Sequence, residues 1–150
     1  MRVVVQRVSQ SNVKVSDDVI GEINEGLMVL VSFVDEDNDT DLSWMTKKII
    51  NLRIFNDNEG KMNRSVQDVV GDILLISQFT LHGSTKKGNR PSFIKAAKPD
   101  FAKVMYEKFI KILEQCLGKE IQTGEFGGDM KVSLVNDGPT TIIIDSKDRE

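Results

Sequence analysis

The sequence predicts a single α+β domain in which strands outnumber helices. Many short segments contain branched or alternating residues, while only two segments show helical periodicity, and these fall between groups of strands. With 150 residues, 39% of them hydrophobic, and no linker-like change of composition, residues 1–150 fit one domain. We therefore expect a mainly antiparallel β-structure with two helices packed on it.

The N-terminal part predicts an antiparallel meander. Residues 1–8 and 12–16 alternate branched and polar side chains, and the polar residues between them can turn, which predicts a hairpin. Residues 19–23 and 27–34 form two further strands after two more turns. Strands joined by such short turns pair with their neighbours in sequence.

Two segments predict helices. Residues 39–52 follow an acidic loop that offers several N-cap residues, and their apolar residues recur at helical spacing. The second helix begins at Pro99 and ends at Gly118. Its apolar face, which we expect to pack on the sheet, contains Val104, Met105, Phe109, Ile112, Leu113 and Cys116. The single cysteine, Cys116, is therefore expected in the core.

The most apolar strand runs through residues 73–76 to Thr80 and ends in hydrogen-bonding side chains. Its wholly apolar start predicts burial on both faces of a sheet. Ser77, Gln78 and Thr80 follow, and a glycine-punctuated basic loop comes next. Three strands then close the chain, at residues 121–126, 130–135 and 140–144.

The polar end of this strand suggests two kinds of chemistry. A hydroxyl of Ser77 or Thr80 can attack a carbonyl carbon once a base removes its proton, and His82 would share a strand face with Thr80. The alternative for His82 is an exposed loop histidine. In a second interpretation, Gln78 and the backbone amides around Phe79 and Thr80 donate to an oxyanion, because a strand end releases its amides. A simple capping role for the hydroxyls stays open.

Gly138-Pro139 is the second candidate motif. Proline permits a cis peptide bond more readily than other residues, and glycine before it leaves the carbonyl uncovered. Such a dipeptide can direct two carbonyl oxygens into a pocket. The alternative is an ordinary turn between two strands.

Charge and composition limit the possible partners. The net charge of −3 argues against a protein that coats nucleic acid, but five basic residues gather in one segment: Lys86, Lys87, Arg90, Lys95 and Lys98. They indicate either a local grip on phosphates or a solvated loop. The apolar runs are shorter than the ~20 residues of a membrane span, and one cysteine suits a reducing compartment. We therefore expect a cytoplasmic protein.

Two motifs resemble the signature motifs of the D-aminoacyl-tRNA deacylases. They are Ser77-Gln78-Phe79-Thr80-Leu81 and Asn136-Asp137-Gly138-Pro139-Thr140-Thr141, in the order and near the chain positions that this family has. The resemblance extends over nearly the whole chain. It implies a homodimer with a barrel-like core that hydrolyses D-aminoacyl-tRNA, and glycyl-tRNA too. It implies no metal or cofactor, and no membrane or DNA partner.

The resemblance also implies roles for residues. Ser77, Gln78, Phe79 and Thr80 hold the ester, with amides near Phe79 at the oxyanion and the ribose 2′-hydroxyl assisting, so Thr80 is no nucleophile. Gly138 and Pro139, in the cis form, reach into the partner's pocket and reject L-amino acids. Phe126 and Met130 match adenosine-lining positions, and Arg7 matches a residue that braces the motif. Thr140 stands where many members have valine, which puts the fine amino-acid preference in doubt.

The basic residues Lys86, Lys87 and Arg90 are our candidates for tRNA phosphate contacts. Two other functions stay open. A related proofreading deacylase for a mischarged L-amino acid shares the scaffold but carries different residues where Ser77 and Gln78 stand. A non-catalytic RNA-binding module would bind tRNA without cleaving its ester.

Overall fold

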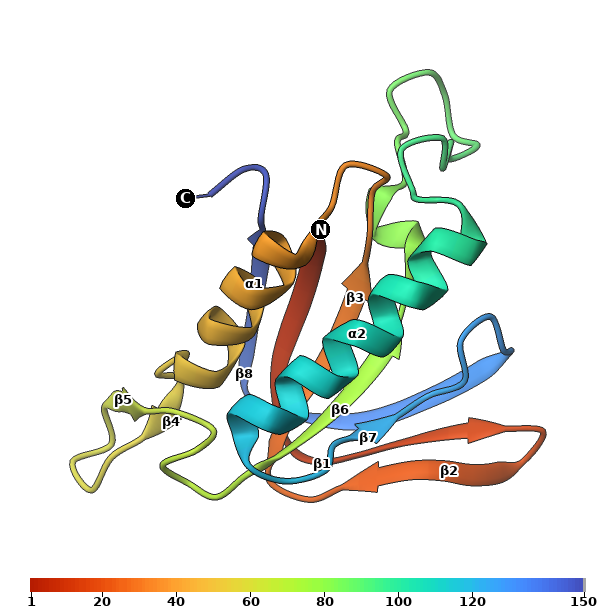
Figure 1. The fold of residues 1–150 in the computed structure, drawn as a ribbon. Coiled ribbons are helices and arrows are strands. Elements are labelled where there is room, and N and C mark those ends of the chain that lie inside the picture. The colour runs from red at the N-terminus through yellow and green to blue at the C-terminus, as the bar shows by residue number, and fades with distance from the viewer. Residues whose placement is uncertain (150) are drawn as a thin grey trace.

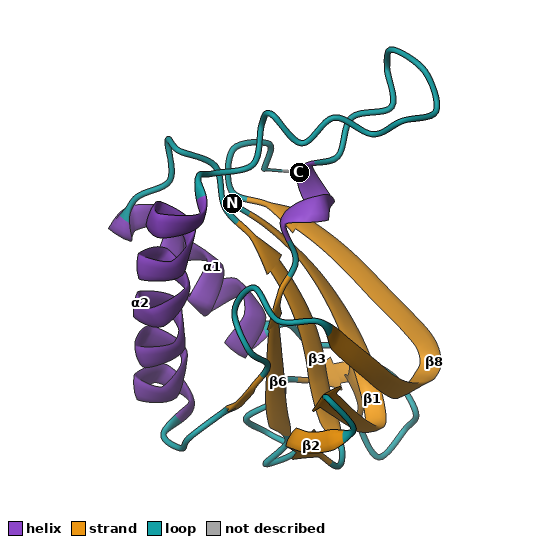
Figure 2. Cartoon of the chain, turned by 90° about the vertical axis from the view of Figure 1, so that its right-hand side faces the viewer, coloured by secondary structure: helices purple, strands orange, loops and turns teal. Residues whose placement is uncertain are grey.

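The computed structural model describes residues 1–149, and a bent sheet of six strands lies at its centre (Figure 1). Its two longest strands are β1 (Arg2–Val15) and β8 (Met130–Asp145). The others are β2 (Asp18–Ile23), β3 (Gly26–Ser32), β6 (Asp72–Ser77) and β7 (Gln122–Thr123). A small hairpin pairs β4 (Phe55–Asn56) with β5 (Met62–Arg64). The bend gives the barrel-like α+β form that we expected (Figure 2).

β1 and β8 pair antiparallel along almost their whole length, from Arg2 opposite Asp145 to Val15 opposite Met130. The hairpin expected within residues 1–16 is therefore wrong, because β8 pairs with residues 10 and 11 and keeps the chain extended there. For the same reason the two strands expected at 130–135 and 140–144 are one strand. Register shifts on either side of Val8 accompany the bend of this pair.

The remaining strands attach to the other edge of β1. β2 pairs with residues 11–15 and β3 with residues 2–8, so β3 pairs with β1 and not with β2, as the expected meander would require. β6 joins β3 and β7 joins β6, both in parallel. The three pairs that β1 makes are antiparallel, as expected, but β3 and β6 end at the same edge of the sheet. The strand expected at 121–126 is reduced to the two residues of β7.

Both expected helices form and cover one face of the sheet (Figure 2). α1 (Asp39–Asn51) begins after Asn38, whose side chain accepts from the Thr40 amide. α2 (Pro99–Leu117) ends at Gly118, whose φ of 79° lies in the left-handed region that favours glycine. Within residues 1–149, neither helix combines the length and apolarity that crossing a membrane requires.

The buried part of α2 is smaller than its periodicity predicted. Met105, Phe109 and Leu113 are buried against the sheet. Val104 is 52% exposed, because it lies about 100° around the helix from Met105. Cys116 is exposed as well, in the last turn beyond these buried residues, so the expectation of a core cysteine is wrong.

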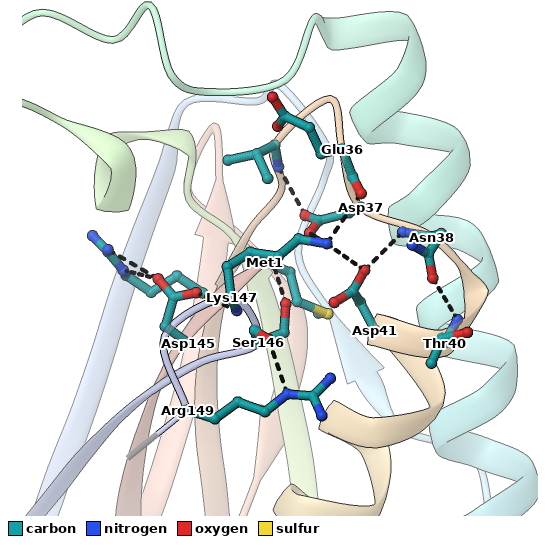
Figure 3. A network of polar contacts seen from close by, with 12 residues as sticks. Met1, Glu36, Asp37, Asn38, Thr40, Asp41, Asp145, Ser146, Lys147 and Arg149 are labelled. Atoms are coloured by element: carbon teal, nitrogen blue, oxygen red, sulfur yellow. Dashed lines mark hydrogen bonds and ion pairs between the residues drawn. The ribbon is translucent and has the colours of Figure 1, made fainter.

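The two ends of the described chain meet beside the start of α1 (Figure 3). The Met1 ammonium donates to the buried Asp37 carboxylate and, at 2.9 Å, to the Ser146 hydroxyl. Lys147 donates to Asp41 at 2.7 Å and lies 3.6 Å from Asp37. Burial acts to raise the pKa of Asp41, but hydrogen bonds from Lys147 and Ser146 outweigh it and hold this pKa below its ordinary value.

We expect Lys147→Met to lower the free energy of unfolding by about 1 kcal/mol at neutral pH, because it removes the cation beside two carboxylates. A carboxyl whose folded pKa is depressed stabilises the fold above its unfolded pKa, and this stability is lost as the pH falls through the folded pKa. The difference in melting temperature between parent and variant should therefore shrink as the pH is lowered below about 4. Lys61→Met, at a well-exposed ion pair, is the control and should change nothing measurable. A difference that is the same at both ends of the pH range would contradict this account.

Candidate active site

A cavity of about 740 Å³ opens where β3 and β6 end. This volume suits a small-molecule-sized group, and the walls are mainly apolar. Ser77, Gln78 and Phe79 form one wall, and Phe126 and Met130 lie among the others. Five of the six residues that the resemblance placed at the ester and adenosine pocket therefore line one cavity, and the sixth, Thr80, is not among its lining residues.

The polar strand end is shorter than predicted. β6 stops at Ser77, and the chain continues into the short 3-10 helix η1 (Phe79–His82) after the Gln78 amide donates to the Val31 carbonyl at 2.7 Å. Thr80 and His82 therefore do not share a strand face, so the geometric basis of that catalytic pair is wrong. The Thr80 hydroxyl accepts from the Gln78 side chain at 2.6 Å instead.

Two backbone donors stay free at this turn. Within residues 1–149, the amides of Phe79 and Thr80 donate no hydrogen bond, whereas the following amides of Leu81 and Gly83 bond back to Gln78 and Thr80. Phe79 lines the cavity. An unpaired amide at a cavity wall can donate to an acceptor on a ligand, including a developing oxyanion.

His82 is buried, with 7% of its surface exposed, so the expectation of an exposed loop histidine is wrong. Its Nε2 atom has no hydrogen-bond partner among the described residues. Burial lowers the pKa of His82, and the nearby positive charge of Arg2 adds to this effect, so the neutral imidazole is favoured. As the last residue of η1, His82 is a packed residue rather than a solvent-exposed one.

Gly138 and Pro139 are joined by a cis peptide bond inside β8 and are both exposed. They do not separate two strands, as an ordinary turn would, and they lie outside the lining of the 740 Å³ cavity of the same chain. Gly138 has a φ of 124°, and a Cβ there would lie 2.8 Å from the Arg7 Nη2 atom. Glycine is therefore required by both backbone conformation and space.

Arg7 holds the segment before this motif. Its Nε donates to the Asp137 carbonyl at 3.1 Å, and its Nη1 donates to the Ile54 carbonyl at 2.6 Å. The Arg7 side chain is almost completely buried, so its packing and its two carbonyl partners fix its position. The structure thus places Arg7 beside Gly138 and away from Phe126 and Met130.

Phe126 and Met130 line another part of the cavity. Phe126 lies in the segment before β8, and Met130 is the first residue of β8. The Phe126 ring lies 5.8 Å from that of Tyr106, whose hydroxyl donates to the buried Leu75 carbonyl. A Cβ at Gly124 would lie 2.4 Å from the Met130 sulfur, so this glycine makes room for Met130. An apolar aromatic and a flexible thioether can pack against a planar ring.

The sequence did not reveal the part that the basic loop plays in the cavity wall. Phe93 lines the cavity and stacks edge-on against Phe79, with ring centroids 5.1 Å apart, and Ile94 lines it while 92% exposed. The only sequence signal for this role was the presence of apolar residues, Phe93 and Ile94, within a basic loop. Lys86, Lys87 and Arg90 are exposed in this loop, which connects η1 with α2 and projects from the body (Figure 1).

Solved structures with the same architecture define the class to which the fold belongs. One, described as a c-Myc DNA unwinding element binding protein, superposes with a TM-score of 0.92 at 39% identity and covers 97% of this chain and 98% of its own. Another, described as a probable eukaryotic D-amino acid tRNA deacylase, has a TM-score of 0.82 at 21% identity, covers 95% of this chain and 97% of its own, and shows the fold alone.

The sequence comparisons narrow this class to one family. Residues 4–145 match the family model described as D-Tyr-tRNA(Tyr) deacylase. The D-aminoacyl-tRNA deacylase of Flavobacterium johnsoniae is 62% identical over 150 residues, and that of Bacteroides fragilis 56%, each alignment covering 100% of both chains. The chain belongs to the D-Tyr-tRNA(Tyr) deacylase family.

Proposed function

We propose that this protein hydrolyses the ester that joins a D-amino acid to the terminal adenosine of tRNA, releasing the free amino acid and the tRNA. It would thus be a carboxylic ester hydrolase of translation quality control, acting in the cytoplasm, where its substrate is. The observation that carries the proposal is a pair of unpaired amides, that of Phe79 at the cavity wall and that of Thr80 directly after it in the chain. Its closely similar relatives are named for this reaction.

The chemistry needs no side-chain nucleophile. As water attacks the ester carbon, the carbonyl oxygen gains negative charge, and the amides of Phe79 and Thr80 donate to it. The 2′-hydroxyl of the terminal ribose assists the attack, and the ester bond breaks to leave the 3′-hydroxyl of the tRNA. Thr80 and Gln78, already hydrogen-bonded to each other, position the substrate, and Ser77 completes this wall. Phe126 and Met130 pack against the adenine ring.

Chiral selection works by steric exclusion of L-amino acids, and a second copy of the chain supplies the excluding groups. Gly138 and Pro139 are exposed and lie outside the cavity of their own chain, so they suit insertion into that of a partner. The apolar side chains of Val135 and Ile143, on the same strand, are 47% and 69% exposed and gain burial in such a homodimer. The carbonyls of Gly138 and Pro139 then occupy the space that an L side chain needs. Glycine has no side chain, so glycyl-tRNA also reacts.

Charged D-tyrosyl-tRNA and L-tyrosyl-tRNA distinguish this proposal from its rivals. We expect release of D-tyrosine between about fivefold and about 150-fold faster than that of L-tyrosine, since overpacking costs about 1–3 kcal/mol and each 1.36 kcal/mol is a factor of ten in rate. Glycyl-tRNA should be cleaved as well. Equal rates for both tyrosine isomers, or release of neither, would refute the proposal. Cleavage of a mischarged L-aminoacyl-tRNA alone would favour the related proofreading deacylase.

Thr80→Ala tests the assignment of the chemistry to the backbone. We expect this variant to keep at least about a tenth of the parental rate, because the Thr80 amide remains and only the hydroxyl contact to Gln78 is lost. Single-turnover kinetics with D-tyrosyl-tRNA measure this. Mass spectrometry of quenched parent enzyme should find no acyl group on Thr80. Trapping such an adduct would make Thr80 a nucleophile after all.

The loop residues Lys86, Lys87 and Arg90 are proposed to contact tRNA phosphates. We expect the pair Lys86→Met and Lys87→Met to raise the KM for charged tRNA and to reduce the salt dependence of log KM by about 1 to 2 in slope, since each phosphate contact releases counterions. The control pair, Lys47→Met and Lys61→Met, removes equal charge elsewhere. An unchanged salt slope would leave these lysines as a solvated loop.

The same protein and charged tRNA also test two alternatives, a non-catalytic RNA-binding module and a DNA-binding protein. A protein that binds tRNA but cleaves no ester would be a non-catalytic RNA-binding module. One similar structure is described by its binding to a DNA element, so duplex DNA of equal length should be included as a competitor. We expect it to compete poorly, because the net charge of −3 confines attraction to the basic loop.

A further inference from the structure

Arg2, the first residue of β1, links the last strand to the turn at the candidate site. Its Nε and Nη2 atoms both lie 2.9 Å from Oδ2 of Asp145. Its Nη1 atom donates to the Leu81 carbonyl at 2.9 Å. One planar guanidinium is thus held by a carboxylate on one side and holds a backbone carbonyl on the other.

The Leu81 carbonyl lies near the C-terminal end of η1. The last carbonyls of a short helix have no partner within the helix, and a cation is favoured at this end. Phe79, with its unpaired amide, is the first residue of the same four-residue turn. Because the turn is short and internally hydrogen-bonded, its two ends cannot move independently.

Among residues 1–149, the other hydrogen bonds that this turn makes with the rest of the chain are uncharged. The Ser32 hydroxyl donates to the Phe79 carbonyl at 3.4 Å, which is long for a hydrogen bond, and His82 is buried with its Nε2 unpartnered among the described residues. The Gln78 amide ties the start of the turn to β3. At the opposite end of the turn, Arg2 makes a charged hydrogen bond to the Leu81 carbonyl.

Arg2 is itself held in place. Asp145 accepts a further hydrogen bond from the Lys147 amide at 2.9 Å, and the neighbouring Ser146 is fixed by the Met1 ammonium (Figure 3). Burial acts to raise the pKa of Asp145, but hydrogen bonds from the Lys147 amide and Arg2 hold it below its ordinary value, so the carboxylate stays ionised at neutral pH. The anchor is therefore charged when the proposed reaction takes place.

We infer that Arg2 is a positioning residue for ester cleavage: by tying the Leu81 carbonyl to Asp145, it sets the orientation of the Phe79 and Thr80 amides. The inference rests on the proposed function, which assigns these amides to the oxyanion. Arg2 is not part of the cavity lining, so it acts through the turn and does not touch the substrate. Its loss should slow the chemical step and leave tRNA binding unchanged.

The test compares single-turnover rates at saturating enzyme with the KM for D-tyrosyl-tRNA. We expect Arg2→Met to lower the rate about tenfold with a KM within about twofold of the parent, because misplaced oxyanion donors affect the transition state more than binding. Arg2→Lys should recover part of the rate, since a single ammonium cannot serve the carboxylate and the carbonyl as the planar fork does. Lys111→Met, on the exposed side of α2, is the charge control and should behave as the parent.

Asp145→Asn separates positioning from general stability. If Asp145 acts through Arg2, the double variant with Arg2→Met should be no slower than Arg2→Met alone. Rates are measured well below each melting temperature, and if Arg2→Met does not fold, Arg2→Lys carries the test, with an expected loss of about threefold. If the parent is active and the Arg2 variants keep its full rate, or differ from it only by a higher KM, the role of Arg2 is overturned. A parent that releases no D-tyrosine overturns the proposed function, and the role of Arg2 with it.

Discussion

The antiparallel pairing of β1 with β8 is the interaction on which the rest of the structure depends. It brings Arg7 beside the Gly138 segment, puts Met130 at the cavity and places Asp145 opposite Arg2. The contacts of Arg7 with Asp137 and of Arg2 with Asp145 join residues more than 100 positions apart in sequence, so local structure could not create them. Gly138 and Pro139 are exposed on the surface, and they do not line the cavity of their own chain.

A second constraint decides where the cavity forms. β3 and β6 are parallel, so their polar ends lie at one edge of the sheet, and the chain leaves β6 there as η1. Ligand sites commonly lie beyond the carboxyl ends of parallel strands, where backbone groups are released from the ladder. The apolar residues of the loop before α2 then cover this edge, and Phe93 contacts Phe79 directly. The site thus combines backbone donors with an apolar enclosure.

Local signals predicted the helices well, because capping residues and apolar spacing act within a few residues of one another. The first strand was wrongly divided, since the polar residues 9–11 are held extended by a strand far along the chain. The turn after Ser77 and the burial of His82 also depend on tertiary contacts that no local pattern carries. The two motifs were recognisable by residue type, but only the fold places Phe79 at a cavity wall and Gly138 away from it.

The free donors at Phe79 and Thr80 belong to the backbone, and this affects how the site tolerates change. Every amino acid except proline carries such an amide, so replacing a side chain there leaves the donor in place. Substitution of Phe79 can therefore reshape the cavity, and substitution of Thr80 can change its contact with Gln78, without removing the groups assigned to the oxyanion. A survey of substitutions that looks for lost chemical groups would overlook them, and only proline would reveal what the main chain contributes.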